Sequence, residues 1–210
     1  MNESPLSCLT GWVFRIFVVH KMQNLYIIAG CNGAGKTTAS LTILPDVLYC
    51  YEFVNADNIA KGLSPFNVDG VAIEAGRIML FRIDELLNKK VDFAIETTLA
   101  SKSYASLIKR AKLLDYEIHL IFFWLSSVEL AKERVKQRVL NGGHDIPKET
   151  IERRYKVGMR NFNHIFRNIV SSWVIYDNSK NTPILVAKKD SESNIEVFNV
   201  EKFKLIENEK

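Results

Sequence analysis

The chain has 210 residues, which is enough for one domain with a substantial hydrophobic core. Hydrophobic residues make up 47 % and charged residues 25 %, so a disordered chain, a collagen-like fibre and a coiled coil are excluded. The net charge of +4 suits a small anionic ligand and is too weak to indicate a nucleic-acid-binding protein. Cys8, Cys31 and Cys50 have no paired spacing, which predicts neither disulfides nor a zinc site and favours a reducing, cytoplasmic location.

Residues 1–21 are interpreted separately from the rest. The apolar run 6–19 is interrupted by Arg15, follows no basic residue and precedes no small-residue cleavage site, so it is not typical of a signal peptide. It is also too short to span a bilayer. Because the first predicted strand begins at Leu25, we interpret Met22 as the natural start and residues 1–21 as a mis-assigned extension. The alternative is a genuine peripheral segment that packs or anchors weakly.

Beyond Met22 strands and helices alternate in a single domain, 22–210, without a linker or repeat. Short apolar runs typical of buried parallel strands, with later edge strands, are expected at 25–29, 52–56, 93–98, 118–125, 173–176, 184–187 and 195–200. Helical spacing of apolar residues predicts helices from about 36, over 71–87, 103–114, 128–139 and 148–162. The run 118–125 is the most apolar and is expected at the sheet centre. This alternation predicts an α/β, doubly wound, mostly parallel sheet.

One motif carries a clear chemical meaning. The sequence GCNGAGKT at 30–37 fits G-x-x-x-x-G-K-[ST] and lies between a predicted strand and a predicted helix, which is the context of a phosphate-binding loop (P-loop). Its backbone N–H groups and the helix N-terminus would hold phosphate, the lysine would bridge the β- and γ-phosphates, and the Thr37 hydroxyl would join a Mg²⁺ shell. The predicted nucleotide-binding residues are Gly30, Asn32, Gly33, Ala34, Gly35, Lys36, Thr37 and Thr38.

The remaining sequence narrows the class of P-loop protein. No N-K-x-D guanine signature occurs, which argues against a Ras-like GTPase. The strand 118–125 is followed by Ser126 and not by the acidic residue that motor ATPases usually need. These absences favour a small-molecule kinase with a helical lid. Cys31 lies inside the loop, so we expect its thiol to be accessible without nucleotide and shielded by Mg·ATP.

Acidic residues follow two other predicted strands. Asp57 closes the second strand and Glu96 lies near the end of the third, and ligands bind at the carboxyl ends of strands in such sheets. Both carboxylates are therefore expected on the phosphate side. Asp57 could instead cap a helix, and Glu96 could make a structural hydrogen bond. Thr97 and Thr98 fit equally well as strand formers or as ligands.

Arginine residues of two predicted helices differ in their angular position relative to the apolar face of the helix. Arg138 and Arg154 border the apolar faces of their helices, whereas Arg134 lies further round and Arg153 points away. Arg138 and Arg154 are therefore the better candidates for stabilising a transferring phosphoryl group; a solvated side chain is the alternative. His144, in the loop 141–147, is a candidate lid residue that contacts the acceptor.

Several separated segments together resemble the zeta toxin family. They are the P-loop, VNADNIAKGLSP at 54–65, AIEAGR at 72–77, FAIETTLAS at 93–101, RVLNGGHDIP at 138–147, RRY at 153–155 and VIYDNS at 174–179. The resemblance covers about residues 24–180. It implies an ATP- or GTP-dependent kinase, in a family whose characterised members phosphorylate the 3′-hydroxyl of the amino sugar in UDP-N-acetylglucosamine, and it implies a possible antitoxin partner.

Family roles transfer to individual positions. The resemblance implies that Asp57 is the catalytic aspartate, that Glu96 is the family's strand glutamate and that Arg138 is its lid-helix arginine. A second family arginine has no direct counterpart, and either His144 or Arg154 would replace it. We therefore expect catalysis by Asp57, Lys36, Arg138 and Arg154, and acceptor binding by Glu96, Thr97, Thr98 and His144, with Glu96 holding the acceptor or a metal-bound water.

Two rival interpretations stay open. One is a kinase of another small metabolite or nucleotide. The other is a nucleotide-binding module whose activity is silent until a partner leaves. A polynucleotide kinase is a weaker third, because no stripe of basic and aromatic residues is visible.

Overall fold

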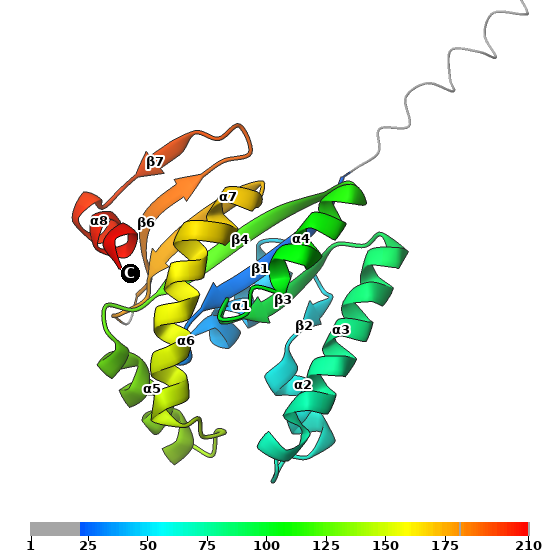
Figure 1. Ribbon diagram of the computed structural model, residues 1–210, viewed down its shortest axis with the longest axis vertical. Coiled ribbons are helices and arrows are strands. Elements are labelled where there is room, and N and C mark those ends of the chain that lie inside the picture. Colours follow the sequence, from blue (N-terminus) through cyan, green and yellow to red (C-terminus); the bar gives the residue numbers. More distant parts are fainter. Residues whose placement is uncertain (1–21, 181, 210) are drawn as a thin grey trace, which may run out of the picture.

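A computed structural model describes residues 22–180 and 182–209, and the interpretation of residues 1–21 lies outside this part. Within it, seven strands form one sheet in the order β2-β3-β1-β4-β5-β6-β7 (Figure 1). The strands are β1 (Gln23–Gly30), β2 (Phe53–Val54), β3 (Phe93–Thr97), β4 (Tyr116–Trp124), β5 (Ser172–Asp177), β6 (Ile184–Lys189) and β7 (Ile195–Val197). The helices are α1 (Lys36–Asp46), α2 (Ala56–Leu63), α3 (Ala72–Lys89), α4 (Tyr104–Leu113), α5 (Val128–Leu140), α6 (Lys148–Asn161), α7 (Arg167–Ile169) and α8 (Val200–Asn208).

The first five strands in the sheet order are mutually parallel, and β6 and β7 continue the sheet in antiparallel pairing. This confirms the predicted α/β, mostly parallel sheet, and β4 lies at its centre as expected. Parallel strands end at one edge of a sheet. The segments that follow β1, β2, β3, β4 and β5 therefore meet at the same edge, and they carry the candidate functional residues.

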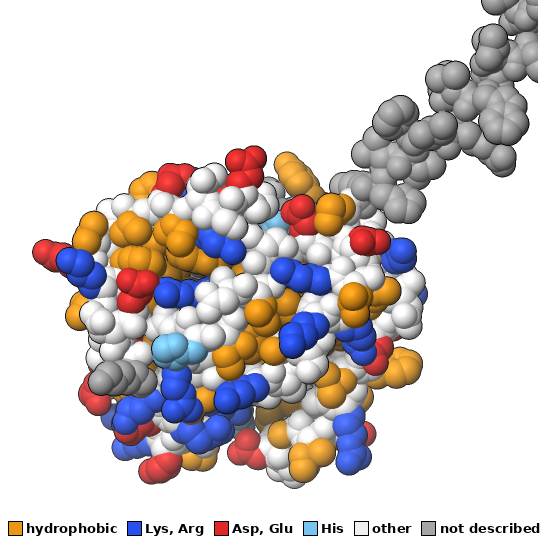
Figure 2. All heavy atoms as spheres, turned by 45° about the horizontal axis from the view of Figure 1, so that its top comes forward, with side chains coloured by type: hydrophobic (Ala, Val, Ile, Leu, Met, Phe, Trp, Pro, Cys, Tyr) orange, Lys and Arg blue, Asp and Glu red, His pale blue; other side chains and the backbone are white. Residues whose placement is uncertain are grey.

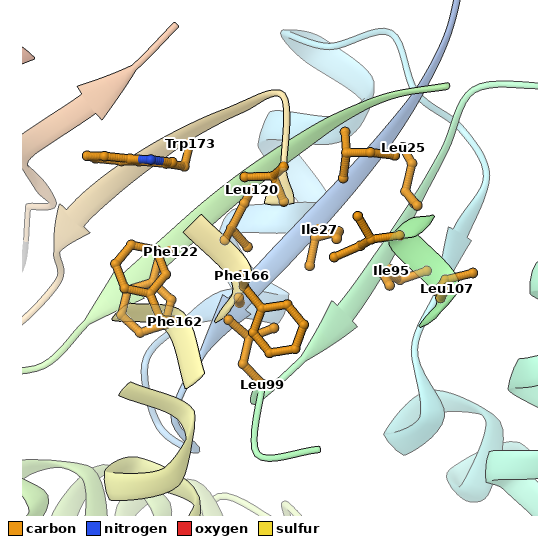
Figure 3. Packing of buried hydrophobic residues seen from close by; sticks show 14 of the residues in the cluster. Leu25, Ile27, Ile95, Leu99, Leu107, Leu120, Phe122, Phe162, Phe166 and Trp173 are labelled. Carbon is orange, nitrogen blue, oxygen red and sulfur yellow. The ribbon is translucent and has the colours of Figure 1, made fainter. Parts of the chain in front are cut away.

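Helices cover both faces of the sheet and bury two apolar clusters. On one face α3, α4 and the end of α6 pack on the inward side chains of β1, β3 and β4. On the other face α1, α5 and the first half of α6 complete a smaller cluster around Ile28 and Phe123. Figure 3 shows Phe122 beside Phe162, whose rings stack with centroids 4.3 Å apart, and Phe166 close to Leu99.

The predicted elements are present, but the helices α2 and α8 were not predicted, and the strand expected at 195–200 is shortened to Ile195–Val197 because α8 begins at Val200. Three further local differences occur. The second strand is only Phe53–Val54, because Asn55 ends it by capping α2. The helix that continues from α6 passes through one π-helical turn, Phe162–Phe166, before α7. A 3₁₀ turn, Asp69–Val71, precedes α3. None of the helices in the described ranges is long and apolar enough to cross a membrane.

Candidate active site

The phosphate-binding loop joins β1 to α1. Gly33 and Gly35 have φ angles of +79° and +80°, which a residue with a side chain rarely adopts, so the backbone turns tightly at both. The helix begins at Lys36 directly after this turn, so its unpaired N–H groups and positive dipole end face the loop. The Lys36 ammonium donates to the Cys31 carbonyl oxygen at 3.0 Å and is buried.

Glu96 lies against the loop. Its carboxylate accepts a hydrogen bond from the Thr37 hydroxyl at 2.8 Å and lies 3.6 Å from the Lys36 ammonium, with the Glu96 side chain only 9 % exposed. A buried carboxylate is costly without partners, and here the loop supplies them. Glu96 was expected on the phosphate side, holding the acceptor or a metal-bound water, and the structure places its carboxylate against the Thr37 and Lys36 side chains of the P-loop.

Asn55 links Glu96 to the helix that carries Asp57. Its amide nitrogen donates to the Glu96 carboxylate at 2.7 Å, and its amide oxygen accepts from the backbone N–H groups of Asp57 and Asn58 at 2.8 and 3.1 Å. Asn55 is therefore the N-cap of α2, the role considered above for Asp57. Asp57 sits in the first turn of α2, where its side chain is exposed.

These residues line one cavity of about 290 Å³. Three cationic and two anionic side chains contribute to it, namely Lys36, Arg153, Arg154, Asp57 and Glu96. Polar groups of Asn32, Asn55, Thr97, Thr98 and Ser101 complete the lining, with Tyr104 on one side. The cavity thus joins a phosphate-binding loop to an exposed carboxylate through a cationic wall.

Both arginines of the RRY segment reach this cavity. Arg154 donates to the Asn32 side chain in the P-loop at 3.3 Å, in agreement with the predicted orientation of Arg154 toward the site. The expectation that Arg153 points away is wrong, because its side chain also lines the cavity. A long arginine side chain on the flank of a helix can turn back toward a cleft, which an angular position on the helix does not exclude.

Arg138 and His144 lie elsewhere. The Arg138 guanidinium donates to the His144 carbonyl oxygen at 2.6 Å and thereby holds the loop 141–147. Neither residue lines the 290 Å³ cavity; His144 lines a second cavity of about 450 Å³ between α2–α3 and the α5–α6 loop. There the His144 Nε2 atom lies 3.3 Å from the Asp69 carboxylate. The predicted catalytic role of Arg138 and the predicted acceptor-binding role of His144 are therefore not supported by their distance from the P-loop cavity.

Thr97 lies in β3, which is one of its two expected roles, whereas Cys31 differs from expectation. The Thr97 hydroxyl accepts a hydrogen bond from the Leu99 N–H group at 3.0 Å, which supports the backbone at Leu99, where φ is +56°. Thr98 lines the cavity. Cys31 was expected to be accessible, but its side chain is buried, and burial raises the pKa of its thiol to about 11.

Three contributors were missed from the sequence. Asn55 is one, hidden inside a short strand prediction. Arg134 is another: its guanidinium donates to the Ser179 carbonyl oxygen at 3.2 Å, and its Cβ atom lies beside Gly33. Asn178 is the third, because its side-chain amide donates to the Ala34 carbonyl oxygen at 2.8 Å. The segment VIYDNS was noticed as a motif, but nothing in one sequence indicates that it folds back onto residues 144 positions earlier.

The donor set fits a magnesium ion held jointly with a nucleotide. Mg²⁺ prefers oxygen ligands and is usually bound by one or two carboxylates together with phosphates and water. The Thr37 hydroxyl and the Glu96 carboxylate are such ligands, and they are already in contact. The described residues contain no group of three or more His, Cys, Asp or Glu side chains that could hold a metal alone.

The sheet, the loop after β1 and the lid-like α5–α6 pair define a P-loop kinase fold. Residues 55–190 match the zeta toxin family, and the chain belongs to that family. An uncharacterized protein of Haemophilus influenzae is 31 % identical over 135 residues, which are 64 % of this chain and 94 % of that protein. The family supports assignment as a P-loop kinase.

Solved structures share the fold at low sequence identity. A chain of the AvrRxo1-ORF1:AvrRxo1-ORF2 complex with sulphate ions superimposes with a TM-score of 0.74 at 15 % identity, over 90 % of this chain and 65 % of that one. This chain thus spans just under two thirds of that relative. A chain of the PezAT toxin–antitoxin system of Streptococcus pneumoniae gives a TM-score of 0.61 at 16 % identity, over 85 % and 76 % of the two chains.

Proposed function

We propose that the chain is a kinase that transfers the γ-phosphoryl group of ATP to a hydroxyl group of a small anionic acceptor. The main support is the arrangement around Glu96, which contacts Thr37 and lies near Lys36 while the Asp57 carboxylate lines the same cavity. Phosphate-binding groups and a candidate base therefore lie in one cleft. Membership of the zeta toxin family supports the same chemistry.

In the proposed reaction the acceptor oxygen bonds to the γ-phosphorus while the bond from that phosphorus to the β–γ bridging oxygen breaks, releasing ADP. Asp57 orients the acceptor hydroxyl and receives its proton. Lys36, Arg153 and Arg154 stabilise the charge on the phosphate oxygens, so catalysis is mainly positioning and electrostatics. When bound, Mg²⁺ would be held by Thr37 and Glu96 and would neutralise phosphate charge.

We propose a UDP-amino sugar as the acceptor, with UDP-N-acetylglucosamine as the first candidate. The support is the resemblance of the motifs described above to characterised zeta toxins, together with the cationic residues Arg153 and Arg154 in the cavity. GTP is the second phosphoryl donor to compare with ATP. A cytoplasmic location and an antitoxin partner belong to the same proposal; PezAT, a fold relative, is itself a toxin–antitoxin system.

Figure 2 bears on the alternative of a polynucleotide substrate. It shows one face, on which lysine and arginine side chains gather toward the lower left with acidic side chains among them. This face therefore lacks the continuous basic track expected along a nucleic-acid strand.

The test is ³¹P NMR of the chain with Mg·ATP and a panel of UDP-sugars. We expect a new phosphomonoester signal that depends on the acceptor, and its loss in Asp57→Asn. Asp115→Asn is the matched control, since Asp115 is an exposed turn residue with positive φ, a conformation that asparagine tolerates. If ATP is consumed but no sugar nucleotide is phosphorylated, and a mass shift shows that another metabolite is, then that metabolite is the acceptor and the proposed UDP-amino sugar is wrong. Binding of ATP without turnover in the presence of any acceptor would overturn the proposal that the chain is a kinase.

A further inference from the structure

The turn that follows β5 touches the phosphate-binding loop from outside. The Asn178 side-chain amide donates to the Ala34 carbonyl oxygen at 2.8 Å. The same amide nitrogen would lie 2.5 Å from a Cβ atom placed on Gly35, so it is packed directly against the peptide that joins Ala34 to Gly35. This contact connects two segments that are distant in the chain.

Peptide geometry gives the contact a consequence for phosphate binding. In a planar trans peptide the C=O and N–H bonds point in opposite directions. A donor that fixes the Ala34 carbonyl on the outside of the loop therefore aims the Gly35 N–H group toward the inside. Phosphate-binding loops depend on such inward N–H groups, because several of them must converge on the phosphate oxygens.

A second set of contacts fixes Asn178 itself. Its backbone N–H group donates to the Trp124 carbonyl oxygen at 2.9 Å. The preceding Asp177 is 3 % exposed, accepts from the Ser179 N–H group at 2.9 Å, and contacts the Lys202 ammonium of α8 at 2.5 Å. Burial opposes ionisation of Asp177, but the bonds from Lys202 and Ser179 outweigh it and hold the pKa of this carboxyl below its usual value.

We propose that Asn178 is a positioning residue for ATP, which holds the phosphate-binding loop in its binding conformation, and that Lys202 of α8 maintains Asn178 through Asp177. This inference rests on the proposed function, because it concerns the affinity of the same loop for nucleotide. Asn178 acts from outside the loop and touches no reacting atom. Its loss should therefore weaken ATP binding and leave the chemical step largely intact.

The test compares Asn178→Ala with Asn178→Asp, which has the same shape but cannot donate to the carbonyl. Asn194→Ala is the matched control, since Asn194 is an exposed turn residue between β6 and β7. Titration calorimetry with Mg·ATP should show a Kd raised about tenfold for both Asn178 variants, because each loses one well-placed hydrogen bond. With an accepted substrate, KM for ATP should rise while kcat stays within about threefold.

Lys202→Met should raise the Kd for ATP in the same direction and by less, because it acts through Asp177. Melting temperatures without nucleotide separate these effects from loss of fold. If Asn178→Ala does not fold, hydrogen exchange of Asn178→Ser decides the question: we expect faster exchange in residues 30–38 and unchanged exchange in β6.

The outcomes separate the two proposals. Binding of Mg·ATP by the unmodified chain with equal affinity in both Asn178 variants would overturn this inference and leave the kinase standing. Failure of the unmodified chain to bind Mg·ATP would overturn both. A fall in kcat at unchanged KM would show that Asn178 acts on the chemical step and would also overturn the positioning role.

Discussion

The contacts of Glu96 with the P-loop favour the metal-linked one of its two expected roles, and this decides the effect that we expect from its substitution. Its carboxylate contacts Thr37 and Asn55 and lies near Lys36, so it belongs to the phosphate end of the cavity. Asp57, in the first turn of α2, is an exposed carboxylate that lines the same cavity, and we propose that it faces the acceptor. The two acids are therefore expected to affect different ligands.

Glu96→Gln keeps the shape of the side chain and removes its charge. We expect the Mg²⁺ concentration needed for half-maximal activity to rise about tenfold or more, because a carboxylate ligand is lost. A Mg²⁺ titration of phosphoryl transfer at saturating ATP measures this, with the exposed Glu133→Gln on α5 as control. An unchanged Mg²⁺ requirement together with a raised KM for the acceptor would show that Glu96 binds the acceptor and not the metal.

Cys31 should react slowly with thiol reagents. The thiolate is the reactive form, and burial raises the pKa of Cys31 to about 11, so at pH 8 the thiolate fraction is roughly a hundredfold lower than for a thiol of pKa 9. We expect iodoacetamide labelling, followed by peptide mass mapping, to be slow at pH 8 and to accelerate up to pH 10. Labelling of Cys31 as fast as a short cysteine peptide at pH 8 would contradict the buried position.

At the scale of elements, the placement of α6 decides which arginines reach the site. Gly158 lies where the helix crosses the end of β3, and a Cβ atom there would be 2.3 Å from the Thr98 carbonyl oxygen. The Asn161 amide donates to the Leu99 carbonyl oxygen at 2.8 Å, and the Tyr155 hydroxyl donates to the Leu125 carbonyl oxygen at 2.7 Å. These contacts seat α6 on two strand ends and bring Arg153 and Arg154 to the cavity.

Gly158→Ala should displace α6 and, with it, the Arg153 and Arg154 side chains that line the cavity. Because the obstructing atom is a backbone carbonyl, we expect a loss of about 1–3 kcal/mol in the free energy of unfolding and a raised KM for anionic ligands. Urea denaturation and steady-state kinetics measure the two effects. Gly76→Ala on α3 is the control, since nothing lies within 4 Å of its added Cβ atom, and it should be neutral or stabilising.

The elements were largely predictable and the contacts between them were not. Apolar periodicity located α3 and β4, and the motif at 30–37 located the P-loop, because both signals are local. The positions of Arg138, Arg153 and Asn178 depend on how a long side chain or a turn meets a segment far away in sequence. Helical angles alone carry no information on that, which is why Arg153 was misplaced and Asn178 was not proposed.

For the whole molecule, the main feature is a cleft formed by the two cavities that lie between two arms of the structure. One arm is α2–α3 and the other is the α5–α6 pair, and both extend beyond the carboxyl edge of the sheet (Figure 1). His144 and Asp69 bring the tips of the two arms together, with Asp69 79 % exposed. An exposed contact of this kind contributes little free energy, so the arms can separate at small cost.

Asp69→Asn should therefore leave global stability almost unchanged while opening the cleft. We expect a change of less than about 1 kcal/mol in urea denaturation and faster tryptic cleavage near Arg138 and Lys148. The control is Asp84→Asn on α3, which breaks the exposed contact of Asp84 with Arg110 of α4, far from the tips of the arms. Equal cleavage rates in both variants would show that the tips do not hold each other.

The contacts of the P-loop with residues far along the chain also have a consequence during synthesis. β1 pairs with β3 and β4, and Asn178 contacts the loop that follows β1. Lys202 contacts the neighbouring Asp177. At about 5–20 residues per second, roughly 10–30 s separate translation of the loop from translation of its last support. A nascent chain therefore carries the complete P-loop sequence before Asn178 and Lys202 have been made, and we expect its affinity for ATP to rise once these two residues take their places.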